Sequence, residues 1–157
     1  MHQLAASLLG GAKQKDVFYN SAAWVAPNKL LLLERVSNPT AGMPGRLTLV
    51  VADLSSATNL VGHPELGEST LDPEKPSPPG YQTLGITPAA TTIVFDSNDV
   101  PAFLAMPPAG AVTPDKLEGV AVINRTTVAI SDDNDFGITN ASDRTRIWVL
   151  RTKAPMY

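Results

Sequence analysis

The feature of this sequence that most constrains its fold is a pattern of short apolar segments that occurs twice. SAAWVAPNKLLLLERV, residues 21–36, and GVAVINRTTVAISDDN, residues 119–134, align without gaps at an offset of about 98 residues. Each has an apolar run, a polar turn, a second apolar run and an acidic end, which is typical of two strands joined by a turn. The same offset aligns residues 45–54 with residues 143–152. The sequence therefore predicts two copies of one strand-turn-strand-loop-strand unit.

The residues between the two copies divide into an irregular segment and one further strand. Residues 61–90 are rich in Pro and Gly and follow neither apolar period, so we expect a surface excursion there. The segment TTIVFD, Thr91–Asp96, is predicted to be a strand that completes the first copy as its fourth. Units of this kind cannot bury both faces alone, so they stack or close radially. The sequence thus predicts an all-β fold with four-stranded blades of the β-propeller type.

Length, charge and cysteine content exclude several classes of protein. A chain of 157 residues with 43% apolar residues can form one domain with its own core. There are 12 basic and 15 acidic residues and no basic cluster longer than a pair, so we expect no nucleic-acid partner. The absence of cysteine excludes disulfides and thiolate metal sites. The apolar run Leu4–Ala12 lacks preceding basic residues and is too short for a bilayer, so we expect neither a membrane span nor a signal peptide in this chain.

Three carboxylates and an amide follow the last apolar run of the second copy, at Asp132–Asp135. Carboxylates this close repel one another and are costly to bury without partners. The run is therefore either a solvated turn, in which the side chains bond their own backbone, or the wall of a site that holds a cation. An EF-hand is excluded, because the sixth and twelfth positions counted from Asp133 are Ile138 and Arg144.

Other acidic residues occupy related positions in the two copies. Glu118 precedes the first apolar run of the second copy, and the offset aligns Glu34 with Asp132. In a propeller the innermost strand of each blade lines a central channel, so residues at strand ends on one face of the ring converge. Ca²⁺ takes about six to eight oxygen ligands. The sequence therefore predicts a metal site formed by Glu34, Glu118, Asp132, Asp133 and Asn134.

The segment KLEGVAVINRTTVAISDDNDFG, residues 116–137, followed by TRIWVLRT, resembles the carboxy-terminal signature of the phytase-like domain family known as "esterase-like activity of phytase". In that family a Glu-Gly pair, here Glu118-Gly119, opens a strand, and an Asn/Asp-rich run ending in Asp-Phe-Gly closes the next. NKLLLLERV resembles the Leu-rich strand that precedes them, so the resemblance extends from about residue 21 to residue 150. Asp132 departs from the family pattern, which often has an amide there.

The resemblance implies an exported bacterial β-propeller, secreted or periplasmic, that hydrolyses phosphoric or carboxylic esters with the help of a divalent cation, Ca²⁺. It also implies that residues 1–157 are the carboxy-terminal part of a longer domain, about two blades. Two blades cannot close a ring, and their terminal strands would present unpaired edges. We therefore expect a second polypeptide or protomer to complete the propeller.

Two functions are consistent with these observations. In the first, a metal-dependent hydrolase, the channel-bound cation polarises the ester oxygen of a small ester or phosphoester substrate and activates water. Asp133 and Glu118 are the predicted catalytic residues, each as ligand or general base. In the second, the chain is a non-catalytic propeller module for assembly or ligand binding, and the acidic residues hold a structural ion.

Overall fold

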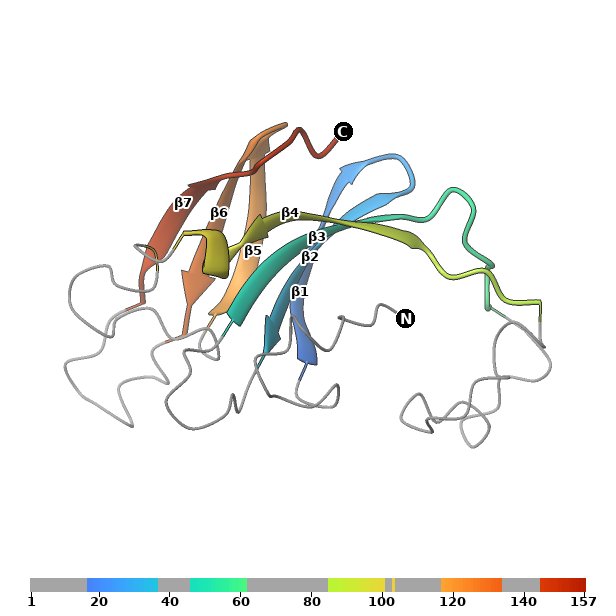
Figure 1. Cartoon of the computed structure of the whole chain (residues 1–157), viewed down its shortest axis with the longest axis horizontal. Helices are drawn as coiled ribbons and strands as arrows, with labels where there is room; N and C mark the ends of the chain where they lie inside the picture. The colour runs from blue at the N-terminus through green and yellow to red at the C-terminus, as the bar shows by residue number, and fades with distance from the viewer. Residues whose placement is uncertain (1–16, 37–45, 62–84, 101–102, 104–116, 134–144) are drawn as a thin grey trace.

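The computed structural model describes residues 17–36, 46–61, 85–100, 103, 117–133 and 145–157, which form two antiparallel sheets (Figure 1). The first sheet has the strand order β1-β2-β3-β4 and the second the order β5-β6-β7. The first contains β1 (Val17–Ala26), β2 (Lys29–Val36), β3 (Arg46–Asp53) and β4 (Ala90–Asp96), which the 3₁₀ helix η3 (Ser97–Asp99) follows. The second contains β5 (Leu117–Asn124), β6 (Thr127–Asp132) and β7 (Ile147–Arg151). The all-β prediction is confirmed, and neither sheet closes on itself within the described residues.

The two sheets repeat the same strand pairing at a constant difference of 98 in residue number. Leu33 of β2 lies opposite Leu49 of β3, and their counterparts, Ser131 of β6 and Ile147 of β7, also lie opposite each other. The register irregularities of the hairpins coincide as well, because β1 and β5 each have one near both ends. The prediction of one unit present in two copies is therefore confirmed by the pairing of six strands.

β4 completes the first unit as its fourth strand, as predicted for Thr91–Asp96, and begins one residue earlier at Ala90. It pairs with β3 along its length, with one irregularity between Leu49 and Val50. Of the predicted excursion, residues 61–90, the greater part lies outside the described residues. The described part from residue 85 to residue 89 has no helix or strand.

The two hairpins close with two-residue turns of different chemistry. Between β1 and β2, Pro27 fixes the first φ near −65°, and Asn28 has a φ of 59°. Asn28 directly follows Pro27, and Asn tolerates a positive φ better than most residues. Between β5 and β6, Asn124 Oδ1 accepts a hydrogen bond from Thr126 N at 3.0 Å, which stabilises an Asx turn. The units thus share a turn length and a register without sharing turn residues.

The hydrophobic core lies between the two sheets. Leucines from β2 and β3 pack against residues of β5, β6 and β7, and the buried set includes Leu31, Leu33, Leu47, Leu49, Val51, Leu117, Val128, Ile130 and Leu150. Removing each such side chain from water stabilises the fold by about 1.5–3 kcal/mol. Phe103 extends the core, with its ring 5.7 Å from Phe95 and 6.2 Å from Trp148 in edge-to-face contacts. The aromatic contacts therefore join β4 to β7.

The carboxy-terminal segment after β7 also joins the two sheets. Lys153 N donates a hydrogen bond to Val94 O of β4 at 2.8 Å, and Met156 N donates one to Arg125 O at 2.9 Å. Met156 is 2% exposed and belongs to the core. This segment therefore connects the first sheet with the turn between β5 and β6.

Equivalent faces of the two sheets differ in exposure. Leu49 and Val51 of β3 face the core and are 0% and 7% exposed, whereas their counterparts Ile147 and Val149 are 71% and 64% exposed. We call the exposed face of the second sheet the outer face; it carries Gly119, Ala121, Ala129, Ser131, Ile147 and Val149, and most of these residues line a shallow hollow. The two units therefore stack in the same sense, and in the described structure no third sheet follows the second.

Candidate functional site

The acidic residues that the sequence singles out lie at one end of the two sheets, where the odd-numbered strands begin and the even-numbered strands end (Figure 1). Glu34 lies near the end of β2, Glu118 near the start of β5, and Asp132 at the end of β6. Asp133 follows directly and is half-buried. Asn134 lies outside the described residues. The structure thus places four of the five predicted residues at the same end, but Glu34, Glu118 and Asp132 form hydrogen bonds with different residues.

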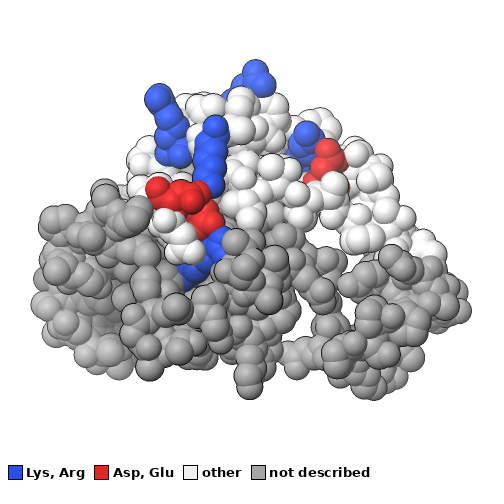
Figure 2. All heavy atoms as spheres, viewed as in Figure 1, with Lys and Arg blue, Asp and Glu red and all other residues white. Residues whose placement is uncertain are grey.

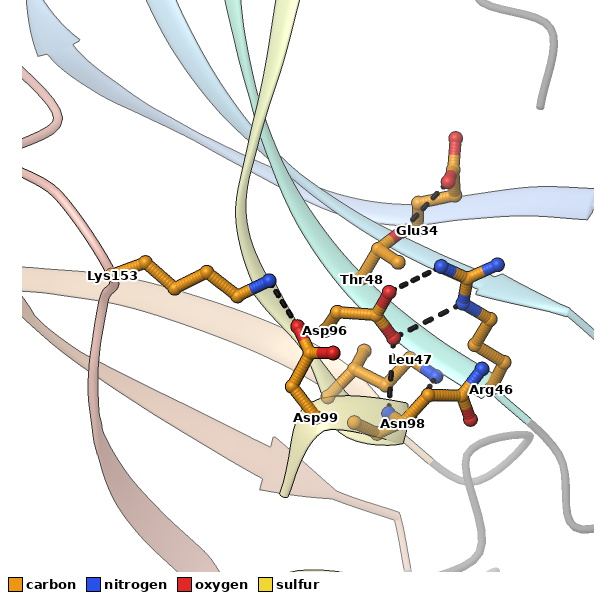
Figure 3. Close-up of polar contacts among 9 residues, drawn as sticks. Glu34, Arg46, Leu47, Thr48, Asp96, Asn98, Asp99 and Lys153 are labelled. Atoms are coloured by element: carbon orange, nitrogen blue, oxygen red, sulfur yellow. Dashed lines mark hydrogen bonds and ion pairs between the residues drawn. The ribbon is translucent and has the colours of Figure 1, made fainter. Parts of the chain in front are cut away.

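Glu34 is fully buried and has hydrogen-bond partners on both neighbouring strands. It lies opposite Tyr19 of β1 and Thr48 of β3. Thr48 Oγ1 donates a hydrogen bond to Glu34 Oε1 at 2.6 Å (Figure 3). The Tyr19 hydroxyl is also hydrogen-bonded to this carboxylate. A carboxylate out of contact with water requires such donors, because an unpaired one would be costly to bury. Tyr19 and Thr48 were absent from the sequence-based candidates.

Tyr19 is expected to make the stability of the protein depend on alkaline pH. Partial burial raises the pKa of its phenol, and the Glu34 carboxylate raises it further by repulsion of the phenolate and by its hydrogen bond. The folded state therefore keeps a proton that the unfolded state releases above about pH 10, so stability is constant below that pH and falls as the pH rises beyond it. Urea unfolding of the parent and of Tyr19→Phe between about pH 9 and 11 measures this effect. An equally steep fall in both proteins would show that Tyr19 is not responsible.

A buried ion pair lies at the same end of the first sheet. Arg46 Nε donates to Asp96 Oδ1 at 3.1 Å, and Nη2 donates to Oδ2, so the pair is bidentate. Asp96 also accepts a hydrogen bond from Asn98 N at 3.0 Å as the N-cap of η3, and Ser97 Oγ accepts one from Leu47 N at 3.1 Å (Figure 3). These contacts attach the end of β4 to the start of β3. They explain how charged side chains are tolerated in the interior.

Asp132, the counterpart of Glu34, is 6% exposed and is also held by its cross-strand neighbour. Arg146 donates its backbone N–H to Asp132 Oδ1 at 2.5 Å and its guanidinium to Oδ2 at 3.3 Å. Arg146 is the counterpart of Thr48, so each copy of the unit pairs a buried acid with a donor on the next strand. The acid that ends the second strand of each unit therefore joins that strand to the third.

Glu118 marks the point at which the two sheets meet through β1 and β5. Glu118 and its counterpart Asn20 each occupy a register irregularity of an edge strand, where bulges commonly redirect side chains. Asn20 Nδ2 donates to Glu118 Oε1 at 3.1 Å and to Leu117 O at 2.9 Å. Val120 N donates to Ser21 Oγ at 3.2 Å. Equivalent positions of the two units thus contact each other, and the Glu118 side chain is exposed.

The glycine that follows Glu118 packs closely against its cross-strand neighbour. Gly119 lies opposite Ser131, and a Cβ at residue 119 would overlap Ser131 Oγ. In the first unit the counterparts are Ser21 and Leu33, where the larger residue lies on β2. A side chain at residue 119 would therefore require the Ser131 hydroxyl to move.

The described residues do not fit the cation that the family resemblance implies. A Ca²⁺ ion needs oxygen ligands that converge from several residues. In the parts of the chain that the structure describes, no three Asp, Glu, His or Cys side chains lie close enough to hold an ion. Glu34 and Asp132 accept hydrogen bonds from within the sheets, and the acidic atoms visible in Figure 2 lie against Lys or Arg. The predicted set that includes Asn134 stays a prediction.

Comparison of the chain with models of protein families, with curated proteins and with solved structures gives no match. The resemblance to the phytase-like domain family therefore depends on the sequence segments quoted above. Among the described residues, no helix combines the length and apolar character that crossing a membrane requires.

Proposed function

We propose that the two sheets are successive blades of a β-propeller-type assembly, and that the chain is an assembly module that a second polypeptide completes. The observation that supports this proposal is the difference between equivalent faces. The face that carries Leu49 in the first unit is covered by the second sheet, whereas the face that carries Ile147 in the second unit is open.

The composition of the outer face also favours a protein partner. It consists of small and apolar side chains, and its two large residues, Ile147 and Val149, are more than half exposed. Contiguous exposed apolar surface marks an interaction site more often than a solvated one. In the first unit the residues at these positions pack on a neighbouring sheet. A third sheet, stacked in the same sense as the first two, is therefore the partner that this face fits.

Native mass spectrometry of the natively purified protein tests this proposal. We expect the parent to be in a complex with a second polypeptide, and Ala121→Lys, which places a charge in the hollow of the outer face, to be free of it. Val61→Lys is the matched control, because Val61 is 90% exposed and lies in neither sheet. A monomeric mass for the parent, unchanged in Ala121→Lys, would contradict the proposal.

A second candidate function is the ester hydrolase implied by the family resemblance. It is supported by two predicted catalytic residues, Glu118 and Asp133, which lie at the same end of neighbouring strands, with Glu118 exposed to solvent. An exposed carboxylate can act as a general base toward a water molecule. Because the described residues do not fit a divalent cation, no step of the reaction is assigned to one. Export of the protein likewise stays a prediction.

Hydrolysis of p-nitrophenyl phosphate and p-nitrophenyl acetate, with and without added Ca²⁺, tests the second candidate. If either carboxylate is the general base, Glu118→Gln or Asp133→Asn should lower kcat/KM by about 10²-fold or more. Asp99→Asn is the control, because Asp99 is an exposed acid paired with Lys153. Equal turnover by the parent and by both variants would exclude these residues from catalysis.

A further inference from the structure

The outer edge of β7 differs from the equivalent edge in the first unit. β3, the counterpart of β7, has a strand on each side, β2 and β4. β7 pairs with β6 on one side, and none of the described strands pairs with its other side (Figure 1). Within the described residues, the second unit therefore has an unpaired edge, which we call the free edge, where the first has β4.

The hydrogen bonds around β7 show which backbone groups this edge presents. Asp132 N donates to Arg146 O, and Thr152 N donates to Thr126 O. In an antiparallel pair the groups of alternate residues face the partner strand, so the even-numbered residues of β7 bond to β6. The free edge therefore presents the amide and carbonyl groups of Ile147, Val149 and Arg151.

The free edge of β7 also lacks the features that protect other edges of this protein. β1 and β5 have register irregularities at both ends, whereas the pairing of β6 with β7 is continuous. Bulges, prolines and charged residues are the usual means of preventing edge strands from pairing. β7 contains no proline, and of its three residues at the edge, Ile147 and Val149 are exposed and apolar, while the charged Arg151 stands at the end of the strand. A regular apolar edge of this kind is typical of a strand that has a neighbour.

We propose that the outer edge of β7 binds an extended strand of a second polypeptide, antiparallel to β7, in the place that β4 occupies beside β3. β4, with the sequence ATTIVFD, shows the chemistry that fits: small and β-branched residues, then an aromatic residue opposite the counterpart of Ile147, then an acid. In the first unit that acid, Asp96, pairs with Arg46. A second copy of β7 would bring Arg151 and no acid to the edge, so a strand of different sequence is favoured.

This inference rests on the proposed function to the extent that both require another polypeptide, but it concerns a different surface. The proposed function requires that the outer face be covered, whereas this inference requires backbone pairing at the edge. Ala121 lies on β5, two strands away from the free edge of β7. Ala121→Lys therefore affects the face and leaves the edge unchanged.

The inference is tested with a synthetic peptide that has the β4 sequence. Its binding to the whole 157-residue chain is measured by fluorescence anisotropy. Val51 lies opposite Thr92, and the odd-numbered residues of β3 face β4, so the N–H of Thr92 faces the neighbouring strand and that of Thr91 faces away. We expect saturable 1:1 binding. Methylation of the peptide nitrogen at the Thr92 position should weaken binding by about tenfold, because one ladder hydrogen bond is lost and a methyl group obstructs the edge. Methylation at the Thr91 position should leave the affinity close to that of the unmodified peptide.

Variants of the protein locate the binding to β7. Val149→Pro removes an N–H at the free edge without removing a bond to β6, and should abolish peptide binding. Ala121→Lys should bind the peptide as the parent does, even if it loses the partner of the outer face. No binding by the parent, equal affinity of the two methylated peptides, or a dimer of the chain that Val149→Pro dissociates would each overturn the inference. The two methylated peptides decide the question even if Val149→Pro does not fold.

Discussion

Asp96→Ala is expected to lower the free energy of unfolding by about 3–5 kcal/mol, because it leaves the guanidinium of Arg46 buried without its carboxylate. The side chains of Arg46 and Asp96 are 5% and 10% exposed, so water cannot replace the lost partner in the folded state. The substitution also removes the N-cap of η3, since Asp96 accepts the hydrogen bond of Asn98 N. Both losses affect the same junction, where β4 ends beside the start of β3.

Chemical unfolding in urea measures this effect, and the chain contains a matched control. Asp99, three residues after Asp96, forms an ion pair with Lys153, but the side chains of Asp99 and Lys153 are 54% and 50% exposed. Asp99→Ala should therefore cost at most about 1 kcal/mol, because solvent screens exposed pairs. Similar losses for Asp96→Ala and Asp99→Ala would show that burial of the Arg46 pair is not the reason for its contribution.

Leu49→Ala is expected to cost about 2–5 kcal/mol, because Leu49 is fully buried between the two sheets and its truncation leaves a cavity. Ile147→Ala, at the counterpart position of the second unit, should change stability by at most about 0.5 kcal/mol, because Ile147 is 71% exposed. The two positions have the same register, opposite Leu33 in β2 and Ser131 in β6. The difference in stability between the two variants therefore measures the effect of covering the face, because the position within the strand is the same.

Urea unfolding of both variants and the parent, at a concentration at which the chain is monomeric, measures the difference. The expected order of unfolding midpoints places Ile147→Ala beside the parent and Leu49→Ala far below. A large loss for Ile147→Ala in the monomer would mean that the outer face is covered in solution by part of this chain, contrary to its exposure in the structure.

The sequence predicts the two hairpins well, because each has apolar runs on both sides of a tight turn. A two-residue turn fixes the pairing next to it, so the opposition of Ala26 and Lys29 could have been deduced from the turn at Pro27-Asn28, whereas that of Tyr19 and Glu34 also depends on the two register irregularities of β1. The opposition of Glu34 and Thr48 could not have been deduced, because the nine residues between β2 and β3 do not fix the register of these two strands. The Arg46–Asp96 pair was beyond prediction for the same reason, since its members are 50 residues apart.

The predicted ion site shows a second limit of sequence reasoning. The sequence places Glu34, Glu118, Asp132 and Asp133 at strand ends, and the structure places them at one end of the sheets. A position at a strand end does not specify which groups a side chain meets. Glu34 meets Thr48 and Asp132 meets Arg146. The offset that aligns Glu34 with Asp132 also aligns Thr48 with Arg146. This second alignment could have predicted that each unit pairs an acid with a hydrogen-bond donor on the next strand.

Thiol labelling of Val51→Cys and Val149→Cys tests most directly the claim that one unit is present twice with its packed face open in the second copy. The chain has no cysteine, so each variant contains a single thiol at the same position of its unit. Val51 is 7% exposed and Val149 is 64% exposed. In the folded, monomeric chain without a partner, we expect the thiol at position 149 to react as fast as a thiol in the unfolded chain, and the thiol at position 51 to react only when the protein opens. Equal labelling rates at the two positions in the folded protein would contradict the account.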